Sequence, residues 1–388
     1  MKITKNLNFT NFRNKNSSLN IINLLYKLLG EDNHILNSLS KSYKNNFGKK
    51  LIYKYKNFSN INIIGMGGSI LGSKCIFNFF KHKIKKKFNF YDRYIDKNFS
   101  GNLKKKTLNL IISKSGNTLE TICNSNLILK KTHKNIFITE NKNSYLMRLA
   151  KKLKSEVVLH NNFIGGRYSV LSEVGMLPAE LMGLNHSKFK NLENLIKNKK
   201  FINALVSNVS KTIFLIKKKK FNSIILNYDE KSSDLFYWYQ QLVAESLGKK
   251  NKGLFPVVSN MPRDNHSLMQ LYLDGTKNNF FTLFFIKENS KAKIIDSKIF
   301  DTHSYLKKKT LNDISYSQFV ATENVFKKKK IPFRSFVVKE RTEQTLGELF
   351  TFFILETILL GNALNINPYD QPAVELIKKD TKKFLLNN

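Results

Sequence analysis

The stretch Asn62-Ile63-Ile64-Gly65-Met66-Gly67-Gly68-Ser69 is an apolar run that ends in a glycine-rich turn, and residues 70–80 follow with the apolar spacing of a helix. The same order recurs at Thr107–Ile112, Ser113–Thr118 and Leu119–Lys130, which are an apolar run, a polar turn and an amphipathic stretch. Parallel strands need crossover helices between them, so this rhythm predicts a doubly wound α/β sheet.

Similar signals continue to the end of the chain. Further strands are predicted at Asn135–Thr139, Val157–Leu159, Ser223–Tyr228, Asn279–Ile286 and Ile331–Val338. Further helices are predicted at Leu171–Met182, Asp234–Leu247, Leu346–Leu360 and from Pro372 to about Phe384. We therefore predict an N-terminal helical segment (1–54), two α/β domains (55–200 and 201–342) and a C-terminal helical arm (343–388).

Composition narrows the class of protein. The 388 residues are 41% hydrophobic and 24% charged, which is typical of globular domains. The apolar stretch Phe352–Ala363 is interrupted by Glu356 and is too short for a membrane span. No apolar signal core follows Met1, and two cysteines favour a reducing compartment. We expect a cytoplasmic protein with no membrane partner.

The charge is unusual, because 66 Lys and Arg against 28 Asp and Glu give +38. Such an excess is compatible with nucleic acid, anionic membranes or anionic small substrates. The excess of Lys, Asn, Ile and Phe also matches AT-rich codons, and we favour this compositional drift for most lysines. The lysines are diffuse and no recognition motif is present, so no specific nucleic-acid partner is predicted.

Two turns are candidate ligand loops. Gly65–Ser69 lies where a helix begins, so its backbone amides are suited to an anion, although a tight turn alone would need the same glycines. Ser113–Thr118 carries three hydroxyls and a glycine at a second such junction, which predicts a metal-free phosphate site. The alternative is simple helix capping by Ser115 or Thr118.

Two further motifs carry groups suited to acid–base chemistry. Arg167 follows two glycines and is a candidate anion ligand, with a surface salt bridge as the alternative. Gln241 and Glu245 share one helix face among apolar neighbours, where a carboxylate has its pKa raised toward general-base duty. An ion-paired, partly buried Glu245 is the alternative.

The remaining candidates are weaker taken singly. His266 could carry a proton or simply fill a capping role. Gln371 and Lys378 lie two helical turns apart on the last helix, where a lysine is ordinarily solvated. The seven histidines show no pair at metal-ligand spacing, so no metal site is predicted.

Six segments in this order resemble the phosphoglucose isomerase (glucose-6-phosphate isomerase) family, in a short bacterial-type form. They are Gly65–Gly72, Ser113–Thr121, Gly165–Ser172, Gln240–Lys249, His266–Leu271 and Asn367–Glu375. The resemblance implies two sugar-isomerase (SIS-like) αβα domains with parallel sheets, and a homodimer. It also implies reversible isomerisation of glucose 6-phosphate to fructose 6-phosphate, an aldose–ketose step of glycolysis and gluconeogenesis that needs no cofactor.

The resemblance also assigns roles to individual residues. Phosphate contacts are implied for Ser113, Lys114, Ser115 and Thr118, and sugar contacts for Gly68, Ser69, Gln241 and Gln371. Glu245 is implied as the base that moves a proton between C2 and C1 through a cis-enediol, and Arg167 as the cation that stabilises it. Ring opening is implied for His266, supplied by the other subunit, and for Lys378.

Three segments depart from the family pattern. Ser115-Gly116-Asn117 replaces the usual Thr-Phe-Thr, Ala373 replaces a glycine, and Met261–Asn265 differs from the usual residues before the histidine. The alternative is a related enzyme or regulator with sugar-isomerase domains that acts on another phosphosugar, such as mannose 6-phosphate or an amino sugar phosphate.

Overall fold

The first of two five-stranded sheets carries the predicted α/β rhythm. The computed structural model describes residues 1–13, 20–95, 106–130, 132–288 and 292–387. The first sheet has the order β3-β2-β4-β5-β6, and every pairing in it is parallel. Its strands are β2 (Asn60–Gly65), β3 (Lys87–Tyr91), β4 (Thr107–Ile112), β5 (Lys134–Thr139) and β6 (Glu156–Leu159).

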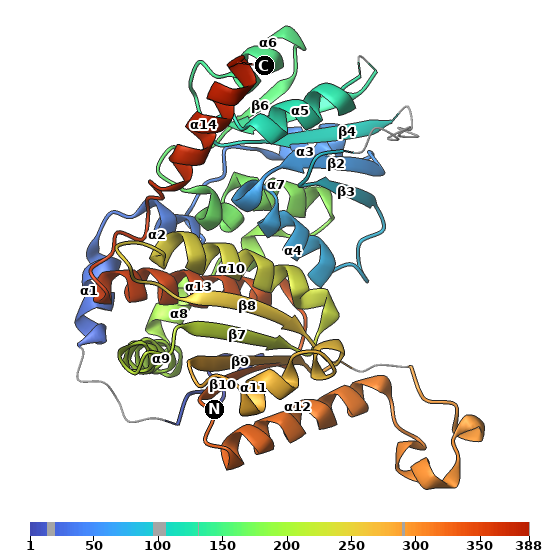
Figure 1. Ribbon diagram of the computed structural model, residues 1–388. Coiled ribbons are helices and arrows are strands. Elements are labelled where there is room, and N and C mark those ends of the chain that lie inside the picture. The colour runs from blue at the N-terminus through green and yellow to red at the C-terminus, as the bar shows by residue number, and fades with distance from the viewer. Residues whose placement is uncertain (14–19, 96–105, 131, 289–291, 388) are drawn as a thin grey trace.

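The second sheet has the order β1-β10-β9-β7-β8. Its strands are β1 (Leu7–Thr10), β7 (Asn222–Asn227), β8 (Phe255–Asn260), β9 (Asn279–Ile286) and β10 (Phe333–Val338). All of its pairings are parallel except that of β1, which runs antiparallel to β10. The two sheets lie one above the other with helices between them (Figure 1), and they confirm the predicted α/β class with parallel sheets.

Strand β1 corrects the prediction of a helical segment over residues 1–54. Leu7 and Phe9 alternate with less buried neighbours, which is the period of a strand with one covered face. The Phe9 ring lies 4.8 Å from that of Phe336 and 5.6 Å from that of Phe352, measured between centroids. Strand β1 is therefore part of the second sheet, and three short helices follow it in the described part of this segment: α1 (Ile21–Gly30), α2 (His34–Ser38) and α3 (Lys49–Tyr55).

Strands β3 and β8 were also absent from the prediction. Both are edge strands, and their sequences, Lys87–Tyr91 and Phe255–Asn260, mix polar and apolar residues. Pro256 within β8 weakens a strand signal, but an edge strand tolerates proline because one of its sides makes no ladder hydrogen bonds.

The helices cover both faces of the sheets. Their bounds are α1 (Ile21–Gly30), α2 (His34–Ser38), α3 (Lys49–Tyr55), α4 (Leu71–Phe79), α5 (Leu119–Ile128), α6 (Tyr145–Lys152), α7 (Glu173–Leu181), α8 (Leu192–Lys197), α9 (Lys199–Lys217), α10 (Ser233–Leu247), α11 (Met269–Asp274), α12 (Leu311–Lys328), α13 (Glu343–Ala363) and α14 (Val374–Asn387). The helix predicted from Leu171 begins at Glu173, because Gly166–Leu171 forms a 3-10 turn.

Helix α13 is the central core helix. By length and composition it could cross a membrane, but 89% of its apolar window is buried inside the fold. Its Glu356 pairs with Arg334 of β10, and both side chains are 1% exposed. Glu356 also accepts hydrogen bonds from Asn208 of α9 and Tyr239 of α10. One buried carboxylate thus joins β10, α9 and α10 to α13.

The last helix, α14, differs from α13 because none of its described residues is buried. Figure 1 shows it as a separate arm that follows α13 and extends along the first-sheet end of the molecule. Every residue from Asp370 to Asn387 is exposed, including the apolar Leu376 and Ile377 at 66% and 72%. The predicted C-terminal helices are therefore present, but only α14 forms an arm, because α13, the first part of the predicted arm (343–388), is buried in the core.

Both sheets reverse their strand order at one point. In the first sheet, β3 lies on one side of β2, and β4, β5 and β6 follow on the other side, so the reversal lies between β2 and β4. In the second sheet, β8 lies on one side of β7, and β9 and β10 follow on the other side, so the reversal lies between β7 and β9. In such sheets the carboxyl ends of the strands at the reversal border a crevice where ligands bind. Gly65 pairs with Ile112 across the first reversal, so the Gly65–Ser69 and Ser113–Thr118 loops begin side by side.

Candidate active site

The glycine loop after β2 lies in tight contact with two other segments. Gly67 has φ +51°, and a Cβ there would lie 2.6 Å from Nε2 of Gln241 on α10. A Cβ on Gly68 would lie 2.1 Å from the carbonyl carbon of Gly166. These contacts exceed what a tight turn requires, because they bring the glycine loop, the Gly-Gly-Arg turn and α10 together.

The hydroxyl loop after β4 is not explained by capping. Thr118 is the N-cap residue of α5, but its side chain makes no capping hydrogen bond. Its Oγ1 lies 2.8 Å from Oγ of the buried Ser113, and Ser115 Oγ accepts from the amide of Asn117 at 3.3 Å. The hydroxyls therefore line the loop itself at the start of a helix, which is the arrangement expected of an anion site.

The guanidinium of Arg167 is held rigidly inside the protein. Its side chain is 1% exposed, so the surface alternative is wrong. Nε donates to Ser246 Oγ at 2.8 Å, and Nη2 donates to the carbonyl oxygens of Pro368 and Asp370 at 2.7 and 3.1 Å. These carbonyls follow α13, about two hundred residues further along the chain. These partners lie in two of the segments that carry the family resemblance, Gln240–Lys249 and Asn367–Glu375, but the sequence gave none of them a role in holding Arg167.

The remaining guanidinium nitrogen faces the candidate base. Arg167 Nη1 donates to Glu245 Oε2 at 3.3 Å and to Gln371 Oε1 at 2.5 Å. The other carboxylate oxygen, Oε1, accepts from Nε2 of Gln241 at 2.8 Å. Glu245 thus lies between a guanidinium and an amide, rather than in the wholly apolar surroundings expected from its helix. Three of the predicted site residues meet around this carboxylate.

The carboxylate borders a cavity of about 490 Å³ between α4 and α10. The cavity is lined by Leu71, Lys74, Asp92, Asp234, Tyr237, Gln240, Gln241, Ala244 and Glu245. Lys74 pairs with Asp92 at 2.8 Å. Of the charged residues in this lining, the sequence singled out only Glu245 and not Lys74, Asp92 or Asp234, since lysines and aspartates usually face solvent.

Burial raises the pKa of Tyr168 to about 12, although its neighbours Arg167 and Ser246 oppose that shift. Its hydroxyl bonds to the Pro368 carbonyl at 3.0 Å, so it stays a neutral donor at physiological pH. A hydrogen bond from Lys249 lowers the pKa of Asp370, whose carbonyl holds Arg167. Both residues help to fix the segment that carries Gln371.

His266 and Lys378, the two residues expected to open the sugar ring, are not brought to this carboxylate. His266 is exposed and ends a 3-10 turn, where its backbone amide donates to Arg263. Lys378 is exposed on α14 and pairs with Glu375 at 2.6 Å. Neither lines the cavity that contains Glu245.

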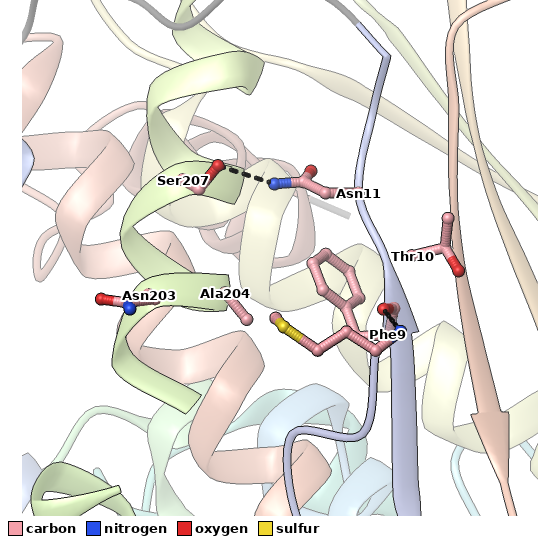
Figure 2. Close-up of a pocket in the computed structure, with 7 residues that line it drawn as sticks. Phe9, Thr10, Asn11, Asn203, Ala204 and Ser207 are labelled. Atoms are coloured by element: carbon pink, nitrogen blue, oxygen red, sulfur yellow. Dashed lines mark hydrogen bonds between the residues drawn. The ribbon is translucent and has the colours of Figure 1, made fainter. Parts of the chain in front are cut away.

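A second cavity, of about 410 Å³, lies between β1 and α9 (Figure 2). It is lined by Met1, Phe9, Thr10, Asn11, Asn203, Ala204 and Ser207, and Asn11 donates to Ser207 at 3.1 Å. No acidic or basic side chain is part of this lining, so it offers no side chain for proton transfer. The cavity beside Glu245 is the candidate active site.

Fold and site together define a two-sheet α/β protein in which a hydroxyl loop and a glycine loop begin side by side, and in which a carboxylate pairs with a buried guanidinium. The chain belongs to the phosphoglucose isomerase family, whose model matches residues 29–387. It is 33% identical over 381 residues to the glucose-6-phosphate isomerase of Methanocaldococcus jannaschii, covering 92% of this chain and 90% of the relative. It is 31% identical over 351 residues to that of Mycoplasmopsis pulmonis, covering 83% and 82%.

Solved structures with low sequence identity share the fold. A hypothetical protein from Thermus thermophilus superposes with a TM-score of 0.80 at 24% identity, over 94% of both chains. A glucose-6-phosphate isomerase from Chlamydia trachomatis superposes with a TM-score of 0.70 at 18% identity, covering 91% of this chain and 78% of the other. The resemblance stated from the sequence is confirmed.

Proposed function

We propose that this chain interconverts glucose 6-phosphate and fructose 6-phosphate, as an aldose–ketose isomerase of glycolysis and gluconeogenesis. Membership of the phosphoglucose isomerase family supports this reaction. The observation that carries the mechanism is the carboxylate of Glu245, which borders a cavity and lies between Arg167 and Gln241.

The proton transfer needs one base that reaches two adjacent carbons. Glu245 removes the proton from C2 and returns it to C1, through a cis-enediol intermediate. Arg167 faces the carboxylate with a fixed charge, so it can stabilise the oxyanion that develops as the proton leaves. A preorganised donor of this kind contributes about 3 kcal/mol to the transition state. Gln241 and Gln371, which bond to these two groups, bind the sugar hydroxyls.

The phosphate gives the substrate its orientation. Ser113, Ser115 and Thr118 hold it through hydroxyls and loop amides, and Lys114 adds a positive charge. The adjoining Gly68 and Ser69 contact the sugar. Binding energy far from the reacting carbons positions C1 and C2 against the base. Every step uses side chains of this protein, and we propose no cofactor or metal.

Opening of the sugar ring is the step for which we propose groups that lie away from Glu245 within a single chain. We assign it to Lys378 and to His266, the latter supplied across the interface of a homodimer. The exposure of His266 and the apolar exposed side of α14 support an assembly of two copies. We place the protein in the cytoplasm, with neither nucleic acid nor membrane as a specific partner.

A coupled assay tests the reaction and the base together. Fructose 6-phosphate is supplied, glucose 6-phosphate formation is measured, and EDTA is present throughout. Glu245→Gln should lower kcat by about a thousandfold or more, because the general base is lost. Glu323→Gln on the distant helix α12 is the matched control and should retain full activity.

The possible outcomes test the isomerase reaction and the role of Glu245 as the base separately. An active Glu245→Gln enzyme keeps the reaction and removes Glu245 as the base. A folded, dimeric wild type that turns over mannose 6-phosphate or an amino sugar phosphate, but not fructose 6-phosphate, moves the function to that substrate.

A further inference from the structure

Residues 139–146, which run from the end of β5 to the start of α6, hydrogen-bond to the hydroxyl loop at Lys114, Gly116 and Asn117. Three hydrogen bonds to the backbone of the hydroxyl loop join the two: Glu140 N to Lys114 O at 3.1 Å, Thr139 Oγ1 to Lys114 O at 3.2 Å, and Leu146 N to Gly116 O at 3.0 Å. The amide of Tyr145 donates to Asn117 Oδ1 at 2.9 Å. The phosphate loop therefore lies against residues 139–146, a segment to which neither the resemblance nor the sequence motifs gave a role.

A buried carboxylate lies where the two loops meet. The side chain of Glu140 is 4% exposed and directly follows β5 at the carboxyl edge of the first sheet. Its Oε1 lies 3.4 Å from Lys114 Nζ, and its Oε2 lies 2.6 Å from Lys142 Nζ. One carboxylate thus holds two ammonium groups, one from each loop.

The cluster of Glu140, Lys114 and Lys142 carries more positive charge than is needed to neutralise the Glu140 carboxylate. A buried carboxylate is costly unless it is paired, and one lysine would complete that pairing. Two lysines on one carboxylate leave a net charge of +1 beside the loop of hydroxyls. The lysine side chains are 33% and 63% exposed, so neither is enclosed by the protein as Glu140 is.

We infer that Glu140 is a positioning residue that holds Lys114 and Lys142 as a pair of cations for the phosphate of the substrate. Lys142 is then a second phosphate-binding lysine, and Glu140 acts only through the two lysines. This inference rests on the proposed function, since it concerns the same site. A lysine is a flexible point charge, and tethering its ammonium group lowers the entropy lost when it meets a dianion.

The direction in which KM changes in Glu140→Gln tests the inference. Glu140→Gln removes a negative charge near the phosphate, so simple electrostatics predicts tighter binding. Loss of the tether predicts weaker binding instead. We expect KM for fructose 6-phosphate to rise about tenfold in Glu140→Gln, with kcat within about twofold of wild type.

Lys142 provides the second variant. Lys142→Ala should raise KM about fivefold, and Lys142→Arg should restore most of the loss, because it keeps a charge that can pair with Glu140. Lys151→Ala, an exposed lysine on α6, is the matched control and should leave KM unchanged. In the Glu140→Gln background, Lys142→Ala should have a much smaller effect, since the two residues act as one unit.

A binding measurement makes the test independent of turnover. The dissociation constant of inorganic phosphate, measured by calorimetry, should rise in both variants in parallel with KM. An unchanged or lower constant in Glu140→Gln overturns the inference, while isomerisation by the wild type still supports the proposed function. If Glu140→Gln fails to fold, Lys142→Ala alone decides: an unchanged phosphate constant overturns the inference.

Discussion

At the carboxyl edge of the first sheet, the crevice between β2 and β4 is bordered by glycines and by the hydroxyls of Ser113 and Thr118. At the same edge of the second sheet, the crevice between β7 and β9 is bordered by Asp229 and Glu288, which follow those strands. The two sheets share a strand order around the reversal, yet one edge is suited to an anion and the other carries acids of its own.

The second crevice is occupied by a side chain of the protein. Arg341, just after β10, is 5% exposed and hydrogen-bonds to both Asp229 and Glu288. Its guanidinium carbon lies 4.8 Å from the centre of the Phe79 ring, and Lys231 pairs with Glu288 at 3.1 Å. The charges that a ligand would meet in this crevice are therefore already paired within the fold.

Helix α4 connects the two edges. It begins directly after the glycine loop of the first crevice and ends at Phe79, under the Arg341 guanidinium of the second. From this comparison we propose a division of labour, in which the first edge binds the substrate and the second fixes helix α4, on which the glycine loop depends. Substitutions in the first crevice should change activity, and those in the second should change stability.

The largest effect is expected at Gly68. In Gly68→Ala the new Cβ would meet the Gly166 backbone at 2.1 Å, so the glycine loop and the arginine turn must separate. We expect kcat/KM to fall by about a thousandfold, because a misplacement on the order of 1 Å at a site costs at least about a hundredfold. The coupled assay measures it.

Gly165→Ala is the matched control for that substitution. Its φ of −65° suits alanine, and its Cβ would meet only Tyr168 at an ordinary 3.7 Å. Activity should stay within a few-fold of wild type. Equal losses in both variants would show that the whole turn is intolerant, and that the contact at Gly68 has no special role.

The next largest effect is expected on stability, from a substitution in the second crevice. Arg341→Met leaves Asp229 and Glu288 without their main partner, so the free energy of unfolding should fall by about 3 kcal/mol. KM for fructose 6-phosphate should stay within about twofold. Urea unfolding and the coupled assay measure the two quantities, with the exposed Arg148→Met as control. A large change in KM at unchanged stability would contradict the division of labour.

The difference between the crevices also marks how far the sequence can predict this molecule. The apolar runs of β2, β4 and β9 and the loops after β2 and β4 are local patterns, and the structure has them where predicted. The partners of Arg167 and Arg341 are not local. Pro368 lies about two hundred residues from Arg167, and Asp229 more than a hundred from Arg341, so no spacing rule joins them.

The two residues proposed for ring opening show a different limit of prediction from sequence. His266 and Lys378 stand in recognisable motifs, but the contacts that would bring them to Glu245 are not formed within one described chain. A pattern of residue types identifies a candidate group without locating it in space. The β1 strand adds a third case, since four residues near a terminus carry too short an alternation to outweigh a helical expectation.

A smaller effect, on KM, is expected to distinguish a hydroxyl at the first edge from a hydroxyl at the second edge. Ser113→Ala removes a loop hydroxyl of the proposed phosphate site, and KM should rise about tenfold with little change in kcat. Ser232→Ala is the counterpart in the second crevice, where the Ser232 hydroxyl donates to Asp229. Its KM should not change. A similar rise in both variants would mean that the second crevice also contributes to substrate binding.

The smallest expected effect is a pH dependence confined to the second crevice. Burial pulls the pKa of Glu288 upward, but the charge and hydrogen bond of Arg341 outweigh it, so the pKa lies below its ordinary value of 4.5. A carboxyl whose pKa is lowered by folding stabilises the protein above its unfolded pKa. That stability is lost as the pH falls through the folded value.

Glu288 is only partly buried, so solvent screening limits its contribution to about 1 kcal/mol or less. Between pH of about 6 and about 3.5, wild type should therefore lose more stability in urea than Arg341→Met, which has already lost the pairing. Hydrogen exchange should place the extra opening at residues 228–232 and leave residues 113–118 unchanged. Equal acid sensitivity in both proteins would show that Arg341 does not hold Glu288 in its charged form, and that the second crevice is closed by packing on Phe79 alone.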